Sequence, residues 1–227
     1  MYPFTGGLNA HLEAQERLYK SKRILVACEE SQAVTKAFRK RGFEAYSCDL
    51  VDCSGGHPEW HLHGDFRKFI FEREWDLLIA HPPCTFLCNS GVRWLKGNPL
   101  RWEQMIEAKE FFYTLWSIGV NHIGKVAIEN PIPHKHAMLP KYTQIIQPWQ
   151  FGHMTTKATC LWLHGLPELK PTNIVYSEMM KLPKAQRSLV HYASPGKERA
   201  KIRSKTYSGI AQAMAQQWGD YLIKNLI

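Results

Sequence analysis

The hydrophobic positions along the chain form short, nearly continuous apolar runs, and longer segments with helical spacing separate them. Short apolar runs bounded by turn residues are typical of strands buried on both faces of a parallel sheet. Such strands are expected at 23–28, 43–49, 76–80 and 125–131, with later strands in 143–152 and 158–165. The segment 54–63 is rich in glycine, proline and histidine, and we interpret it as a loop.

Helical spacing is found in the segments 8–20, 31–42, 101–119 and 207–223. In the third segment one apolar face is expected to pack on the sheet, formed by Trp102, Met105, Ile106, Phe112, Leu115 and Trp116. The alternation of strands and helices indicates an α/β fold with a mostly parallel central sheet flanked by helices. Residues 1–21 are expected to form a helical extension, and residues 22–227 a single domain.

The composition suits a globular domain, since 44% of the 227 residues are hydrophobic. No apolar tract is long enough to span a bilayer, and the N-terminus lacks the apolar core of a secretory signal. We therefore expect a cytoplasmic protein without a membrane partner. Its six cysteines are expected to be reduced, and one of them is a candidate nucleophile.

The chain carries 29 basic and 20 acidic residues, and its net charge of +9 favours a polyanionic partner. Eight basic residues and one acid, Glu198, stand between positions 181 and 205; the basic ones are Lys181, Lys184, Arg187, Lys197, Arg199, Lys201, Arg203 and Lys205. This basic strip is either a solvated loop or a phosphate-binding surface, and the neighbouring His191 and Tyr192 are able to stack on bases.

Reactive side chains stand at the ends of three expected strands. Asp49 ends the second strand, Cys84 follows the third in the string AHPPCT, and Glu129 and Asn130 end the fourth. The carboxyl ends of parallel strands share one sheet edge, where ligands of open α/β sheets bind. Two prolines stiffen the loop that presents the cysteine. A thiol beside a carboxylic acid indicates covalent catalysis, although a free cysteine is more often a small buried hydrophobe.

A second cluster of ligand-type side chains consists of Cys53, His57, His61 and His63. Their spacing fits no common zinc finger and turn residues surround them, so no metal site is expected. Cys88, four residues after the candidate nucleophile, is either a redox partner or a loop residue, and the second interpretation is favoured.

Eight strings occur in order along residues 22–224: LVACE, CDL, GD, AHPPCT, AIENP, QPWQFGH, KATCLWL and SGIAQAMAQQWG. Together they resemble the motifs of DNA (cytosine-5) methyltransferases, in particular the short members encoded by phages and prophages. The resemblance implies a Rossmann-like methyltransferase fold, S-adenosylmethionine as methyl donor and DNA as partner. It implies methylation of cytosine at carbon 5 and, for a phage-encoded enzyme, a place in the host cytoplasm and protection of phage DNA from restriction.

The resemblance also implies roles for single residues. Cys84 adds to carbon 6 of cytosine, and Glu129, with Asn130 beside it, protonates ring nitrogen 3. Asp49 binds the ribose of the cofactor and Asp65 its adenine amino group. The other cofactor positions are Cys28, Glu29, Ser31, Pro82 and Ser208. The nucleic-acid positions are Lys157, Thr159, Arg187, Arg199, Lys201, Arg203 and Lys205.

The chain departs from the family pattern in three places. The paired arginines of the family near the seventh motif strand are absent, and Lys157 and Thr159 stand roughly there. The loop after the first strand reads CEESQAV and lacks the usual glycines, so this turn must be built differently. Only 40 residues separate Gly165 from Thr206, too few for the separate target-recognition domain of larger relatives. The basic insertion near 172–205 is expected to replace it with phosphate contacts, which give affinity but little sequence information.

Two other functions fit the same residues. A methyltransferase acting on a cytosine nucleotide or on RNA needs no DNA-recognition domain. A non-catalytic nucleic-acid-binding homologue keeps the fold and the basic strip, although it has no chemical reason to retain both Cys84 and Glu129.

Overall fold

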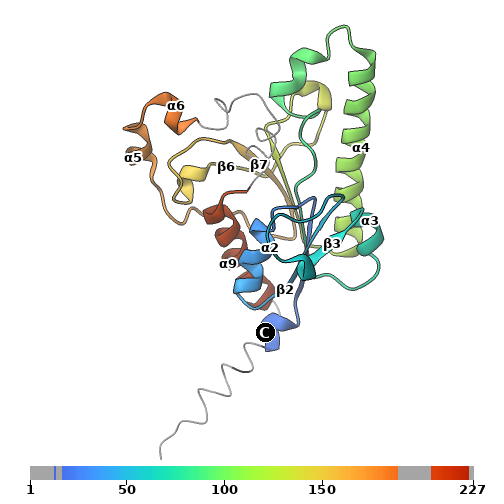
Figure 1. Ribbon diagram of the computed structural model, residues 1–227, viewed down its shortest axis with the longest axis vertical. Coiled ribbons are helices and arrows are strands. Elements are labelled where there is room, and N and C mark those ends of the chain that lie inside the picture. The colour runs from blue at the N-terminus through green and yellow to red at the C-terminus, as the bar shows by residue number, and fades with distance from the viewer. Residues whose placement is uncertain (1–12, 14–16, 189–205, 225–227) are drawn as a thin grey trace, which may run out of the picture.

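The computed structural model describes residue 13, residues 17–188 and residues 206–224 (Figure 1). Within these ranges one seven-stranded sheet has the order β3-β2-β1-β4-β5-β7-β6. The strands are β1 Arg23–Ala27, β2 Glu44–Asp49, β3 His61–His63, β4 Leu77–Ala80, β5 Val126–Pro131, β6 Gln144–Ile146 and β7 Thr159–His164. Only β7 runs antiparallel to its neighbours among these pairings. The predicted α/β class with a mostly parallel sheet is therefore confirmed.

Helices cover both faces of this sheet. The α-helices are α2 Ala33–Lys40, α3 Phe66–Phe69, α4 Pro99–His122, α5 Tyr176–Met180, α6 Lys184–Arg187 and α9 Ser208–Lys224. Short 3₁₀ helices are η1 Pro58–Trp60, η2 Asn89–Trp94, η3 Lys135–Ala137 and η4 Pro148–Gln150. Figure 1 shows α2 and α9 side by side on one face, with α4 along the opposite face.

The apolar core is divided by the sheet into two layers. Ile24 and Val26 of β1 pack in the layer that contains α2 and α9, whereas Leu25 and Ala27 pack in the layer that contains α4. Successive side chains of a strand point to opposite faces, so a strand buried on both sides needs an unbroken apolar run. The sequence RILVA meets this requirement, and it places β1 at the centre of the domain.

The first four expected strands are confirmed as β1, β2, β4 and β5, each within one residue at either end. Two other predictions were wrong. The expected loop 54–63 contains η1 and β3, because His61–His63 pairs with the edge of β2 in spite of its turn-rich surroundings. In 143–152 only Gln144–Ile146 is a strand, because Pro148 begins η4 and has no N–H for a strand ladder.

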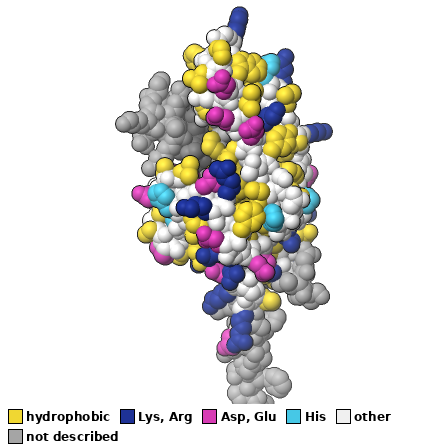
Figure 2. Space-filling view, turned by 90° about the vertical axis from the view of Figure 1, so that its right-hand side faces the viewer, with side chains coloured by type: hydrophobic (Ala, Val, Ile, Leu, Met, Phe, Trp, Pro, Cys, Tyr) yellow, Lys and Arg dark blue, Asp and Glu magenta, His cyan; other side chains and the backbone are white. Residues whose placement is uncertain are grey.

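Helix α4 is longer than predicted and its apolar face is narrower. Its 24 residues measure about 36 Å at 1.5 Å per residue, roughly twice the length of the strands beside it. Met105, Phe112 and Leu115 are buried, but Trp102 and Ile106 are 38% and 47% exposed. The first turns extend past the ends of the strands, so these two side chains have no sheet to cover them (Figure 1). Figure 2 shows this side of the molecule, with hydrophobic and charged side chains interspersed.

The ends of the domain are only partly described. Residues 17–20 of the expected N-terminal helix are helical, and Tyr19 packs edge-on against Phe43 with ring centres 4.9 Å apart. The described part of the basic insertion near 172–205 contains the short helices α5 and α6. Of the helices that the structure describes, none is long and apolar enough to cross a membrane.

Candidate active site

The strand order reverses its direction between β1 and β4. From β1 the chain first adds β2 and β3 on one side of β1. It then returns and adds β4 and β5 on the other side of β1. Ligands of open α/β sheets bind at such a switch point, beyond the carboxyl ends of the strands. A cavity of about 540 Å³ lies at this position. It is lined by Cys28, Glu29, Glu30, Ser31, Asp49, His81, Pro83, Cys84, Thr85, Cys88, Ser90, Gly91, Trp94, Arg101 and Thr206.

The loop after β1 turns without glycine, by means of two left-handed residues. Cys28 has a φ of 58° and Gln32 a φ of 55°, a conformation that costs a non-glycine residue roughly 1–2 kcal/mol. The Gln32 side chain compensates by donating to the Ser47 hydroxyl (3.2 Å) and the His57 carbonyl (2.8 Å). It also accepts from the His57 N–H at 3.1 Å. The missing glycine turn is thus replaced by a buried side-chain anchor.

Glu29 fixes the same loop to the first turn of α2. Its carboxylate accepts hydrogen bonds from the Val34 N–H (2.6 Å), the Thr35 N–H (3.2 Å) and the Thr35 hydroxyl (2.6 Å). Burial raises the pKa of Glu29, and these hydrogen bonds oppose that effect. Although Glu29 borders the cavity, both of its carboxylate oxygens are already hydrogen-bonded within the protein. Glu29 therefore holds the predicted cofactor loop in position through its hydrogen bonds to the first turn of α2.

The two predicted cofactor carboxylates lie on the Cys28 side of the site. Asp49 ends β2 and lines the cavity, with one oxygen 3.3 Å from the Val51 N–H. Asp65 caps α3 and forms an ion pair with Arg67 at 2.6 Å, which lowers the pKa of Asp65. Burial raises the pKa of Cys28, and the charges of Asp49 and Asp65 raise it further. Asp49 thus faces the cavity, whereas Asp65 does not line it.

The loop after β4 is held by contacts to β1, β5 and α4. The His81 N–H donates to the Ala27 carbonyl at 3.0 Å. The Asn130 side chain donates to the carbonyl of the buried Pro82 at 3.0 Å, and the Arg101 guanidinium contacts the Thr85 carbonyl at 3.3 Å. The structure thus places Asn130 behind the loop rather than in the cavity lining.

The Cys84 thiol lines the cavity and forms a pair with Cys88. The Cys88 N–H donates to the Cys84 carbonyl at 3.1 Å. The hydrogen bond between the two thiols raises the pKa of Cys84, and burial and the charge of Glu129 raise it further. The positive charge of Lys157 acts in the opposite direction. Cys84 is therefore a thiol in this structure, and Lys157 is a cation placed to favour its thiolate.

Glu129 pairs with His81 beneath the Cys84 loop. His81 Nδ1 lies 2.8 Å from Glu129 Oε2, and the side chains are 10% and 9% exposed. Burial acts to lower the pKa of His81, but the hydrogen bond and charge of Glu129 outweigh it and raise the pKa. Burial acts to raise the pKa of Glu129, but His81 and Lys157 outweigh it and lower the pKa. The proton between the two side chains therefore resides on the His81 imidazole, and Glu129 is a carboxylate.

His81 is a site residue that the sequence reasoning missed. Its Nε2 atom is buried and has no hydrogen-bond partner among the residues that the structure describes. The same holds for Asn130 Oδ1. Buried polar atoms are nearly always satisfied in folded proteins, so the Nε2 atom of His81, which lines the cavity, indicates a place for a polar ligand or water. The signal in the sequence was the position of His81 at the end of β4, immediately before the two prolines.

The predicted nucleic-acid residues occupy different positions. Lys157 lies near Glu129 and Cys84, with its ammonium 6.0 Å from the Tyr207 ring centre. Thr159 is 3% exposed and donates to the Lys157 carbonyl at 3.1 Å. The Arg187 carbonyl in α6 accepts hydrogen bonds from neighbouring threonines. Arg199, Lys201, Arg203 and Lys205 lie outside the described residues, as does the strip between 189 and 205.

Ser208 lies in a second cavity, of about 1020 Å³, next to the first. The two cavities share Glu30, Ser31 and Thr206 as lining residues. Ser208 begins α9, where the Gly209 N–H donates to His153 Nε2 at 2.9 Å. This bond joins the QPWQFGH and SGIAQAMAQQWG strings in space.

The histidines of the candidate zinc cluster have separate partners. His57 pairs with Glu59 (3.0 Å), His61 lies 2.9 Å from the Ser47 hydroxyl, and His63 pairs with Asp52 (2.8 Å). Over the described ranges, no group of three or more metal-ligand side chains is found.

Comparisons with known proteins find structural likenesses but no matching family. No protein-family model matches the chain, and no curated protein matches it. An uncharacterized protein from Listeria monocytogenes serotype 4b is 14% identical, with a TM-score of 0.37. The likeness covers 95% of this chain and 97% of that one. At this level of similarity it carries no information on function.

Proposed function

We propose that the protein is an S-adenosylmethionine-dependent methyltransferase that modifies carbon 5 of cytosine in DNA through a covalent Cys84 adduct. The observation that carries the proposal is a single cavity at the switch point, lined both by Cys84 and by Asp49 and the loop after β1. A group-transfer enzyme needs its nucleophile and its cofactor pocket to open into one space, and this cavity provides it.

The residues on the β1 side of the cavity fit the cofactor. Asp49 offers a carboxylate at a strand end, where hydroxyl groups of a ribose are bound in related folds. Cys28 and Ser31 border the same space and would enclose the amino-acid part. When bound, S-adenosylmethionine supplies an electrophilic methyl group. The cavity volume of about 540 Å³ lies in the range of small-molecule sites.

The side chains on the β4 and β5 side supply the covalent chemistry. The Cys84 thiol releases its proton to water, and the charge of Lys157 stabilises the thiolate. Sulfur then bonds to carbon 6 of cytosine while ring nitrogen 3 takes the proton that His81 and Glu129 share. Carbon 5 becomes nucleophilic and would accept the methyl group, with the sulfur that carried it leaving as a neutral thioether. Loss of the carbon-5 proton to a base restores the ring double bond and expels the Cys84 thiolate, and ring nitrogen 3 returns its proton to the His81–Glu129 pair.

Trapping with 5-fluorocytosine tests the proposal. Fluorine at carbon 5 does not leave as a proton does, so an active enzyme stays attached to the DNA. We expect an adduct on denaturing gels with duplex DNA containing 5-fluorocytosine and S-adenosylmethionine. Its mass should equal the sum of protein, DNA and one methyl group.

Two cysteine variants serve as a matched pair in this experiment. Cys84→Ser should form no adduct, whereas Cys88→Ser, four residues away in the same loop, should still form it. An adduct on RNA but not on DNA would show that the substrate is RNA and would support the covalent mechanism. Absence of an adduct on both, with a soluble and folded protein, would contradict the proposal.

A second function is supported by the state of the Cys84 thiol. Its raised pKa disfavours the thiolate, which suits a nucleic-acid-binding homologue without turnover. Calorimetry with S-adenosylmethionine separates the two functions, with Asp49→Asn as the variant expected to weaken cofactor binding. If the protein binds DNA but neither the cofactor nor 5-fluorocytosine, the non-catalytic function is favoured.

A further inference from the structure

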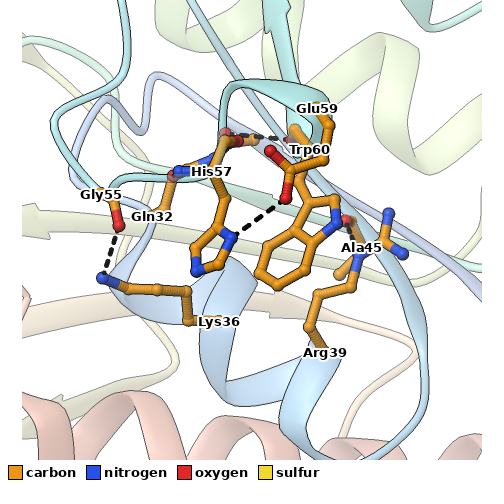
Figure 3. Close-up of polar contacts among 9 residues, drawn as sticks. Gln32, Lys36, Arg39, Ala45, Gly55, His57, Glu59 and Trp60 are labelled. Atoms are coloured by element: carbon orange, nitrogen blue, oxygen red, sulfur yellow. Dashed lines mark hydrogen bonds and ion pairs between the residues drawn. The ribbon is translucent and has the colours of Figure 1, made fainter.

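A third cavity lies on the outer side of α2, away from Cys84, and has a volume of about 760 Å³. Its lining residues are Lys20, Lys36, Arg39, Lys40, Gly42, Phe43, Glu44, Tyr46, His57 and Trp60. We call it the α2 groove. His57 stacks on Trp60 with ring centres 3.8 Å apart and planes at 11° (Figure 3). The Arg39 guanidinium lies over the rings of Tyr46 (4.7 Å) and Trp60 (5.1 Å).

The charge of the groove is positive. Helix α2 contributes Lys36, Arg39 and Lys40, and it contains no acidic residue. The carboxylates nearby already have partners, since Glu44 pairs with Arg23 at 3.0 Å and Glu59 pairs with His57 at 3.0 Å. The helix cations are oriented by neutral contacts: Lys36 donates to the Gly55 carbonyl and Arg39 to the Ala45 carbonyl (Figure 3).

The groove is connected to the candidate active site by shared lining residues. Lys36 and Lys40 line both the α2 groove and the cavity that contains Ser208. That cavity in turn shares Glu30, Ser31 and Thr206 with the Cys84 cavity. Lys36 and Lys40 stand one helical turn apart, so their ammonium groups follow one side of α2. The three cavities thus adjoin one another in turn, from the Cys84 cavity to the α2 groove with its stacked His57–Trp60 pair.

We infer that the α2 groove binds the phosphate backbone of the nucleic-acid strand whose base enters the Cys84 cavity. Surface cations beside aromatic rings are typical of surfaces that hold single strands. Helix α2 measures about 12 Å over its eight residues at 1.5 Å per residue. This length corresponds to about three or four nucleotides at 3.4 Å per base. The inference rests on the nucleic-acid partner of the proposed function, but not on methyl transfer.

Binding measured by fluorescence anisotropy tests this inference without reference to catalysis. The probe is a fluorescein-labelled 20-nucleotide single-stranded DNA, titrated with the full-length protein over a series of salt concentrations. For Lys36→Gln/Lys40→Gln we expect binding about tenfold weaker near 0.1 M salt, since two phosphate contacts are lost. The slope of log K against log salt should fall by about 1.4, at roughly 0.7 per contact on single strands.

A matched pair on another surface controls for net charge. Lys141 and Lys170 are exposed and line none of these three cavities, so Lys141→Gln/Lys170→Gln should bind nearly as the wild type does. Equal weakening in both double variants would overturn the inference. If Lys36→Gln disturbs folding through its contact with Gly55, the exposed Lys40→Glu should weaken binding by itself.

Two further arms separate this inference from the proposed function. If wild-type protein forms the 5-fluorocytosine adduct but Lys36→Gln/Lys40→Gln binds normally, the groove inference fails and the proposed function stands. If tripolyphosphate competes as well as the oligonucleotide at equal phosphate concentration, the groove is a simple anion site and the inference fails.

Discussion

The loops after β1 and β4 border the same cavity but are built by different means. The β1 loop turns through two left-handed non-glycine residues, and the buried side chains of Glu29 and Gln32 hold it with six hydrogen bonds. The β4 loop is stiffened by prolines, and its side-chain supports are Asn130, Arg101 and the His81–Glu129 pair. The first loop is thus fixed by buried side-chain hydrogen bonds, whereas the position of the second also depends on the charged His81–Glu129 pair.

This difference indicates where each loop can change. A loop held by buried hydrogen bonds loses stability when one of its side chains is removed, since the partners stay buried and unsatisfied. A loop held by a proton-sharing pair responds to pH and to ligands that carry polar atoms. The side of the cavity proposed to hold the cofactor should therefore be fixed, and the side that carries Cys84 should respond to pH and ligands.

The largest effect is expected for Glu29→Ala. The substitution leaves the N–H groups of Val34 and Thr35 without their acceptors, at a cost of about 3 kcal/mol in the free energy of unfolding. Urea denaturation measures this value. Glu30→Ala, at the adjacent position, should change stability by less than about 0.5 kcal/mol, as surface substitutions do. A similar small change in both variants would contradict the anchoring role of Glu29.

Gln32 separates backbone strain from side-chain anchoring. Gln32→Ala should destabilise the protein by about 2–3 kcal/mol, because the N–H and carbonyl of His57 lose their partner. Gln32→Gly loses the same bonds but relieves the left-handed strain, so it should be more stable than Gln32→Ala by roughly 1 kcal/mol. Equal stability of the two variants would show that the positive φ is not strained.

Asn130→Ala probes the second loop, where a single hydrogen bond is removed. The carbonyl of Pro82 loses its donor, and we expect a cost of about 1–2 kcal/mol in unfolding free energy. Adduct formation with 5-fluorocytosine should fall more steeply than stability, because Cys84 follows Pro82 by two positions. The control is Asn121→Ala at an exposed position of α4, which should leave both the unfolding free energy and adduct formation unchanged.

The smallest effect is a pH dependence that follows the His81–Glu129 pair. The raised pKa of His81 stabilises the fold below its ordinary value of 6.5, and this contribution disappears as pH rises through the raised value. The lowered pKa of Glu129 stabilises the fold above 4.5, and this contribution disappears as pH falls through the lowered value. The contribution of the pair should therefore be largest between pH 4.5 and 6.5.

Melting temperatures of the wild type and His81→Gln across this range measure the effect. The difference between the two proteins should narrow as the pH rises above 6.5. A constant difference at all pH values would mean that the imidazole contributes only packing.

The sequence predicted the strand ends better than the side-chain contacts around them. Asp49 and Cys84 were expected at one sheet edge, and they line one cavity because parallel strands bring their carboxyl ends together. The anchoring roles of Glu29 and Gln32 could not be predicted, since they depend on a left-handed turn that no glycine marks. His81 and Glu129 are 48 positions apart in the chain, and their pairing depends on the adjacency of β4 and β5 in the sheet.

The length of α4 has a consequence for the active site. Gly119 allows the end of the helix to approach the sheet, since a side chain there would meet Leu78 and Val126 at 2.8 Å. Arg101, near its start, reaches the Thr85 carbonyl in the Cys84 loop. The 18 positions between them make about five turns, so both residues face the same way along one rigid rod. Deletion of one residue from the exposed first turns would rotate Arg101 by about 100° and withdraw its contact from the loop. The helical phase of the first turns of α4 therefore helps to hold the loop that carries Cys84 in place.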